Sequence, residues 1–126
     1  MPVDDICSPV TERTLQEPTL LLLTALADAP RHGYALIQEV SAISDGRVKL
    51  RTGTLYGALD RLLGQGLIEV VGEEVVDGRA RKTYALSGSG RELLAAEAER
   101  LRRIAAQAEQ RLAAARRPAP QPGFAS

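Results

Sequence analysis

Residues 53–62 read GTLYGALDRL, and this stretch decides the fold because its apolar side chains recur at the period of an α-helix. Leu55, Leu59 and Leu62 form one apolar stripe. Small, polar and charged residues form the opposite face: Gly53, Thr54, Gly57, Asp60, Arg61 and Gly64. Glycine in a helix costs about 1 kcal/mol relative to alanine, so outward glycines indicate a backbone that another surface approaches closely. The alternative is that these glycines are simply tolerated.

Upstream of this helix, the sequence predicts two further helices and a short strand. Leucine and alanine are dense in residues 15–29, and Pro30 ends the helix that they predict. A second helix ends at residues 44–46, which read SDG. Val48–Leu50 alternates, which predicts a short strand before the third helix begins near Thr52.

Downstream, the sequence predicts a β-hairpin and a long helix. Residues 67–71 and 83–86 are apolar or alternating, as is typical of strands. Asp77-Gly78 lies between them and is a strong signal for a tight hairpin turn. Ser87 then suits the N-cap of a long helix that is rich in Ala, Glu and Arg.

This order of elements is that of a winged helix-turn-helix followed by one extra helix, a mainly α fold with a small β-hairpin. In such folds the third helix enters the major groove of DNA. We therefore divide the chain into a flexible N-terminal arm (1–14), a DNA-binding domain (15–90), a C-terminal dimerisation helix (91–116) and a disordered tail (117–126).

Basic residues gather in two places, although 16 Lys and Arg balance 16 Asp and Glu over the whole chain. The first cluster includes only one acid, Asp60, and consists of Arg47, Lys49, Arg51 and Arg61. The second is accompanied in the sequence only by Asp77 and consists of Arg79, Arg81 and Lys82. Two local patches on a neutral chain favour a defined electrostatic footprint over a tail that coats polyanions.

The candidate DNA contacts lie on the third helix, just before it, at the start of the second helix and on the hairpin. They are Tyr34, Arg51, Thr52, Thr54, Tyr56, Gly57, Arg61, Arg79, Arg81 and Lys82. Cations on the hairpin suit phosphate contacts, which supply affinity rather than sequence choice, and a helix N-terminus offers free N–H groups to phosphate. Structural alternatives are a solvated hairpin, a capping role for Thr52, an ion pair for Arg61 and a buried Tyr56.

A second copy of the chain is the simplest cover for two apolar surfaces. Residues 20–23 are all leucine, so the first helix is apolar on nearly every face. The last helix carries an Ala- and Leu-rich heptad seam. The expected dimer contacts are Leu20, Leu23, Leu94, Leu101, Ala105, Ala108 and Leu112. The alternative is that the last helix folds back on the first helix of its own chain.

Composition argues against most enzymes. The chain has one cysteine, Cys7, and one histidine, His32, so neither a His/Cys metal site nor a His-based triad with a spare partner is available. We expect no cofactor and no bound metal. The longest apolar run, residues 20–23, is far short of a membrane span. The first residues, MPVDDIC, lack a basic cluster and do not resemble a secretory signal, so we expect a cytoplasmic protein.

Four segments in this order and spacing resemble the signatures of the PadR family of transcriptional regulators. They are HGYALI (32–37), GTLYGALDRL (53–62), GLI (66–68) and KTYALS (82–87). The sequence departs from the family pattern at Gly57, where proline is frequent, and at Thr83, where tyrosine is frequent. The resemblance implies a dimeric DNA-binding repressor that is often ligand-responsive and dimerises through its fourth helix.

The residues and the resemblance together predict a homodimeric repressor that binds double-stranded DNA at an inverted repeat. A small-molecule effector is possible, but the chain has no Trp and one Phe, Phe124, so an aromatic sandwich site is unsupported. The alternative effector site is a pocket lined by Leu and Ala of the first and last helices. The alternative function is a winged-helix adaptor for protein interaction without sequence-specific DNA binding.

Overall fold

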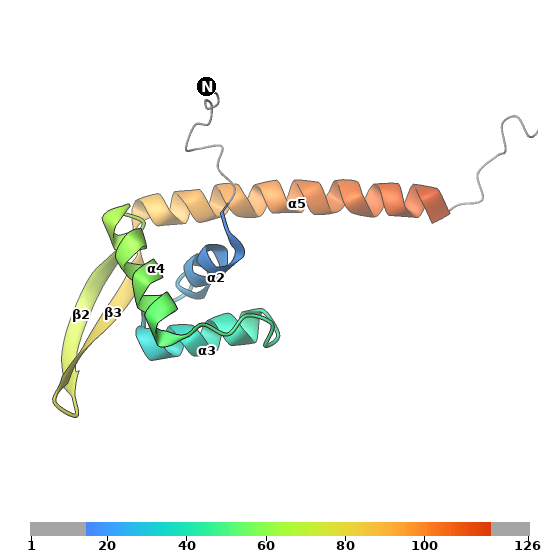
Figure 1. Ribbon diagram of the computed structural model, residues 1–126. Coiled ribbons are helices and arrows are strands. Elements are labelled where there is room, and N and C mark those ends of the chain that lie inside the picture. Colours follow the sequence, from blue (N-terminus) through green and yellow to red (C-terminus); the bar gives the residue numbers. More distant parts are fainter. Residues whose placement is uncertain (1–14, 117–126) are drawn as a thin grey trace, which may run out of the picture. The chain divides into compact units, whose positions relative to one another are not determined.

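The structure is a computed structural model that describes residues 15–116. In chain order its elements are α2 (Glu17–Ala25), β1 (Arg31–His32), α3 (Gly33–Ile43), α4 (Thr52–Gly64), β2 (Ile68–Val76), β3 (Arg79–Leu86) and α5 (Gly88–Arg116) (Figure 1). The predicted mainly α fold with a small β-hairpin is confirmed. The predicted N-terminal arm (1–14) and C-terminal tail (117–126) lie outside the described residues.

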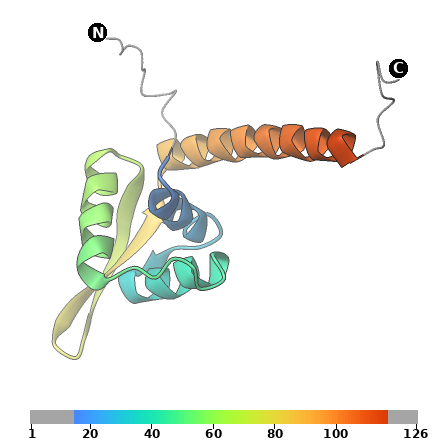
Figure 2. The same ribbon diagram turned by 45° about the vertical axis from the view of Figure 1, so that its right-hand side comes forward.

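Three helices and one face of the sheet enclose a single core. Its completely buried side chains come from α2, α3 and α4 and are Leu22, Leu23, Leu26, Leu36, Val40, Leu55, Leu59 and Leu62. The sheet adds Ile68, Tyr84 and Leu86, each at most 5% exposed. Figures 1 and 2 both show α4 lying between α3 and the base of the hairpin, so α4 buries one face and leaves the other open.

The first described helix is shorter than the sequence predicts, because α2 ends at Ala25 rather than near Ala29. Its last turn contains no basic residue. Two arginines from elsewhere donate to backbone carbonyls at the end of this helix: Arg31 Nε to Ala25 O, in its last residue, at 2.8 Å, and Arg91 Nη1 to Ala27 O, two residues later, at 3.2 Å. Cations near the C-terminus of a helix stabilise its unpaired carbonyls and its dipole.

The third strand of the sheet is not the predicted one. Val48–Leu50 forms no strand; instead β1, at Arg31–His32, pairs antiparallel with β3. The strand order is β1-β3-β2, which makes β2 an edge strand. His32 also begins α3, because its Nδ1 accepts a hydrogen bond from Ala35 N at 3.4 Å.

The hairpin turn forms where the sequence predicts it. Asp77 and Gly78 both have positive φ, 54° and 75°, which is the conformation of a tight two-residue hairpin turn. The strands on either side are longer than predicted, and one bulge at Val71 interrupts their register. The turn therefore projects beyond the N-terminal end of α4 (Figures 1 and 2).

Ser87 joins the hairpin to α5. Its Oγ accepts a hydrogen bond from Gly90 N at 3.0 Å, which confirms the predicted N-cap, and donates to Gly66 O at 2.6 Å. One side chain thus ties the start of α5 to the corner between α4 and β2.

The described chain forms two compact units that divide at Ala95 and Ala96. The first holds all elements up to the start of α5, whose Leu93 and Leu94 pack against the core. Among the described residues, the second unit consists of the rest of α5, in which every residue from Leu101 to Arg116 is exposed.

Candidate nucleic-acid interface

The outward face of α4 is open, as the sequence predicts. Leu55, Ala58, Leu59 and Leu62 are buried, whereas the residues of the opposite face are exposed. A Cβ built on any of the three outward glycines, Gly53, Gly57 and Gly64, would meet nothing within 4 Å. A flat surface can therefore reach the backbone of α4 along this face.

The N-terminus of α4 has no side-chain cap. Arg51 occupies the N-cap position and makes no capping hydrogen bond, so the alternative in which Thr52 caps the helix is wrong. Thr52 and Thr54 are both exposed in the first turn. The first N–H groups of this helix are consequently free of side-chain acceptors and lie at the positive end of its dipole.

The loop before α4 contributes two free cations and one that is already paired. Arg47 donates from Nη1 to Glu17 Oε1 at 3.1 Å, and this hydrogen bond lowers the pKa of the Glu17 carboxyl. Lys49 and Arg51 are exposed and form no ion pair within the described residues. The basic patch predicted here is therefore smaller than the sequence suggests.

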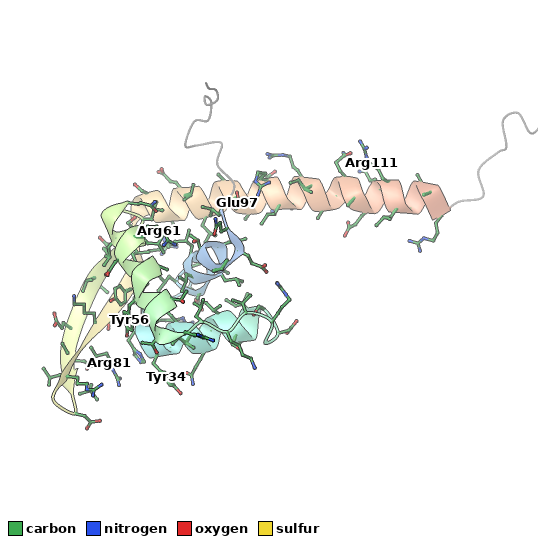
Figure 3. The ribbon with its side chains drawn as sticks, in the orientation of Figure 1. Tyr34, Tyr56, Arg61, Arg81, Glu97 and Arg111 are labelled. Carbon is green, nitrogen blue, oxygen red and sulfur yellow. The ribbon has the colours of Figure 1, made fainter. Side chains whose placement is uncertain are left out.

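Tyr34 and Tyr56 differ in their surroundings. Tyr34, on α3, is 64% exposed, and Figure 3 shows it on the outer side of the first turn of that helix. Tyr56 packs its ring against Gly33, since a Cβ on Gly33 would clash with the tyrosine hydroxyl and lie 2.8 Å from Cζ. Tyr56 thus holds α4 against α3, although 42% of it remains exposed.

Tyr84 lies behind Tyr56 on β3. It is 4% exposed. Burial makes the largest contribution to raising the pKa of its hydroxyl, and the nearby Tyr56 and Asp60 raise this pKa further. Because its ring joins the core, this residue supports α4 from the sheet rather than offering a contact.

Arg61 is exposed, but its guanidinium has a neighbour. Nη2 lies 3.4 Å from Thr19 Oγ1 at the start of α2, and no acid pairs with it within the described residues. Figure 3 shows Arg61 at one end of α4 and Arg81 beyond the other end. The structure therefore brings Arg81 and Tyr34 to the same end of α4 and leaves Arg61 apart from them.

The local sequence suggested that Asp77 is the only acid near the cations of the hairpin, but the structure adds two more. Strand pairing sets Glu74 opposite Arg81 and Glu73 opposite Lys82. Counting outward from the Asp77-Gly78 turn would have revealed both pairs, because a two-residue turn fixes the register. The bulge at Val71 could not have been found in this way.

The expected dimer surface divides into covered and exposed residues. Leu23 is completely buried in the core of its own chain, so its assignment to a dimer contact is wrong. Leu20 is half-buried and Leu94 packs partly against the core. The remaining predicted contacts, all on α5, are exposed: Leu101, Ala105, Ala108 and Leu112.

The sequence reasoning missed Ile104, which is 51% exposed on α5. It lies three residues after Leu101 and four before Ala108, a spacing that places the three on one side of a helix. Ion pairs within the helix flank this side: Arg100 Nε donates to Glu97 Oε1 at 3.0 Å, which raises the pKa of the arginine.

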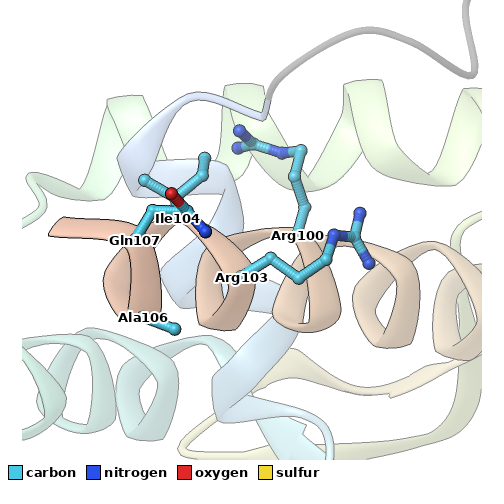
Figure 4. A pocket seen from close by; sticks show the side chains of 5 residues that line it. All are labelled: Arg100, Arg103, Ile104, Ala106 and Gln107. Atoms are coloured by element: carbon cyan, nitrogen blue, oxygen red, sulfur yellow. The ribbon is translucent and has the colours of Figure 1, made fainter. Parts of the chain in front are cut away.

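A depression of about 480 Å³ lies along the same helix. Figure 4 shows the side chains that line it, which are Arg100, Arg103, Ile104, Ala106 and Gln107. All five belong to α5, so the described chain forms one wall of this depression and does not enclose it.

Two other kinds of site are not formed by residues 15–116. No group of three or more His, Cys, Asp or Glu side chains in this range could hold a metal ion. None of the described helices combines the length and apolar character that crossing a membrane requires.

Comparison with known proteins identifies the family of this fold. Residues 22–96 match the sequence model of the transcriptional regulator PadR-like family. The chain is 38% identical over 86 residues to transcriptional regulator Rv3488 of Mycobacterium tuberculosis, covering 68% of this chain and 77% of that protein. It is 42% identical over 85 residues, 68% of this chain, to an uncharacterized 37.1 kDa protein in transposon TN4556 of Streptomyces fradiae, but spans only 23% of that protein.

Solved structures show the same architecture. A PadR family transcription regulator from Clostridium difficile superposes with a TM-score of 0.64 at 24% identity, covering 77% of this chain and 99% of that one. Bacillus subtilis PadR in complex with operator DNA superposes with a TM-score of 0.56 at 19% identity, covering 63% of this chain and 46% of that one.

Proposed function

Because the chain belongs to the PadR-like family of transcriptional regulators, we propose that it is a homodimeric repressor that binds an inverted-repeat operator in double-stranded DNA. The observation that carries the proposal is the outward face of α4, where the glycine backbone is open and the helix N-terminus is uncapped. We place the protein in the cytoplasm, where a regulator meets its DNA.

In this proposal α4 enters the major groove. Gly57 and Thr54 lie on its exposed face, and a missing side chain at Gly57 allows the helix axis to approach the base edges. The free N–H groups around Thr52 can donate to a backbone phosphate, as helix N-termini do. Phosphate contacts of this kind fix the orientation of the helix, and base-edge contacts select the sequence.

The flanking elements supply phosphate contacts. Tyr34, in the first turn of α3, and Arg51, directly before α4, are both exposed, and the hairpin adds Arg79, Arg81 and Lys82. The Bacillus subtilis PadR solved with operator DNA supports DNA as the partner. Arg61 lies apart from this group, so we assign it to a phosphate at the far end of α4.

The exposed side of α5 supports dimerisation. Leu101, Ile104 and Leu112 are 39%, 51% and 66% exposed in the single chain, and a second copy of the helix would cover them. The depression in Figure 4 lies on this helix and would gain its second wall from the partner. A small-molecule effector that binds there would act on the dimer.

A DNA-shift assay with the promoter region beside the gene for this protein tests the proposal. We expect two chains to bind one inverted repeat whose half-site centres are about 10 bp, or a multiple of this, apart. Affinity should fall steeply with salt, because several cations per chain release counterions from phosphates. Absent or salt-insensitive binding would favour the protein-interaction adaptor instead.

A further inference from the structure

The two strands of the hairpin carry opposite charges. β2 contains Glu69, Glu73 and Glu74 and no base. β3 contains no acid, and its bases are Arg79, Arg81 and Lys82. The hairpin that the proposed function brings to DNA is therefore not simply basic: an acidic edge strand runs beside the cations.

One of these acids lies beside Arg81. Glu74 is its partner across the strands, and the carboxylate Oε2 lies 4.0 Å from the guanidinium Nη1. Directly opposed side chains share one face of a sheet, so both groups look the same way. Arg79 lies on that face too, but its partner is Val76 and not a carboxylate.

This pair changes what Arg81 can contribute to DNA binding. Neutralising a phosphate requires a cation that is free to approach it, and Arg81 must first leave Glu74. The carboxylate then remains within a few ångströms of the phosphate and repels it. Both side chains are substantially exposed, 41% for Arg81 and 61% for Glu74, so the pair is weak enough to be displaced.

The cost of displacement differs between operator and random DNA. On the operator, α4 seated in the groove would hold one phosphate at a fixed place beside the hairpin, and Arg81 can exchange the carboxylate for that phosphate. On random DNA the protein stays loosely positioned, so the exchange is not favoured and the carboxylate repels the backbone.

We propose that Glu74 is a specificity-determining residue: it holds Arg81 and thereby weakens binding to non-specific DNA more than binding to the operator. The proposal rests on the proposed DNA-binding function. Glu74 acts through Arg81, and so it is a positioning residue rather than a contact.

The test compares Glu74→Gln with Glu69→Gln in the full chain. Glu69 lies on the same strand, is exposed and faces Ala85 rather than a cation, so both variants change the net charge equally. Fluorescence anisotropy would give the affinity for the operator and for a random duplex over a range of salt. Thermal unfolding would confirm that both variants fold.

For Glu74→Gln we expect binding to the random duplex to tighten about fivefold, which corresponds to a weak surface ion pair. The slope of log affinity against log salt should steepen by about one unit, and the operator-to-random ratio should fall. Glu69→Gln should change affinity less than about twofold. In an Arg81→Gln background, Glu74→Gln should lose most of its excess effect over Glu69→Gln, because the ion pair is already absent and only the direct repulsion by the carboxylate remains.

Equal effects of Glu74→Gln and Glu69→Gln in the parent chain would overturn the role of Glu74 while leaving DNA binding intact. Equal tightening on operator and random DNA would also overturn it, because specificity would then be unchanged. If no variant and not even the parent chain binds either duplex, the proposed function fails, and the role of Glu74 fails with it.

Discussion

Helices α2 and α5 are both rich in apolar side chains, but these side chains are buried in α2 and partly exposed in α5. In α2, Leu21, Leu22 and Leu23 are at most 8% exposed, because the core of the single chain covers them. In α5, Leu101 and Leu112 are 39% and 66% exposed. Apolar density alone therefore does not identify an interface between chains; the elements packed around each helix decide.

This difference separates what holds one chain together from what we propose joins two. The sequence suggested that α2 needed a second subunit, but the core of the single chain already covers Leu21, Leu22 and Leu23. The surface left for a second subunit is the exposed side of α5, where the apolar residues recur among ion-paired Glu and Arg.

The largest expected effect lies in α2. Leu23→Ala should lower the free energy of unfolding by about 2–5 kcal/mol, as truncation of a completely buried leucine does. Gln110→Ala, at an exposed position of α5 outside the proposed dimer contacts, should change the free energy of unfolding far less. Urea denaturation at one fixed protein concentration measures both. Similar losses for the two variants would erase the contrast between the helices.

The next effect concerns the exposed side of α5. Leu101→Glu should dissociate the dimer, because it would bury an unpaired charge between the two copies. Gln110→Glu adds the same charge at an exposed position on the other side of the helix and should leave the dimer intact. Light scattering should report 13.5 kDa for the first variant and twice this mass for the second. A Leu101→Glu protein that stays dimeric would exclude this side of α5.

The first unit also contains both packed and open positions, and two of its glycines allow them to be compared. Gly33→Ala should cost about 1–3 kcal/mol, because the new methyl group meets the Tyr56 ring. Gly53→Ala meets nothing within 4 Å and should stabilise α4 by up to about 1 kcal/mol. Thermal unfolding of the two variants gives the sign of each change; a stabilising Gly33→Ala would mean that Tyr56 does not pack there.

The smallest effect is a pH dependence. The raised pKa of the Tyr84 hydroxyl means that folding favours its neutral form. Its contribution to the stability of the fold is complete below about pH 10 and is lost as the pH rises through the pKa of the hydroxyl in the folded state. Tyr84→Phe should therefore reduce the loss of stability above about pH 10. Tyr34→Phe, which removes a hydroxyl from a 64% exposed tyrosine, serves as the control for the loss of one hydroxyl group. Denaturation curves on both sides of this pH measure the difference.

Local signals in the sequence were sufficient for the elements that local chemistry determines. The periodic leucines of α4, the Asp77-Gly78 turn and the Ser87 cap all predicted what the structure contains. The strand Arg31–His32 could not be predicted in this way, since two residues show no alternation and their partners lie more than fifty positions along the chain.

The candidate site was predictable in composition, but its pairing was predictable only on the hairpin, where the turn fixes the register. The exposed glycines of α4 follow from its helical period. The pairs Arg47–Glu17 and Arg61–Thr19 join residues about thirty and forty positions apart, and only the folded packing of α2 against the α4 region brings them together. Such contacts decide which cations stay free, and sequence periodicity does not contain them.

The central claim is that the glycine face of α4 meets DNA, and Gly57→Leu tests it most directly. A leucine there meets no protein atom near its Cβ and is the better helix former, so the thermal stability should stay equal or rise. The account predicts that operator affinity falls by at least about tenfold, roughly the loss of one base-reading contact, and falls more than affinity for random DNA. A folded Gly57→Leu protein with unchanged operator affinity would contradict the account.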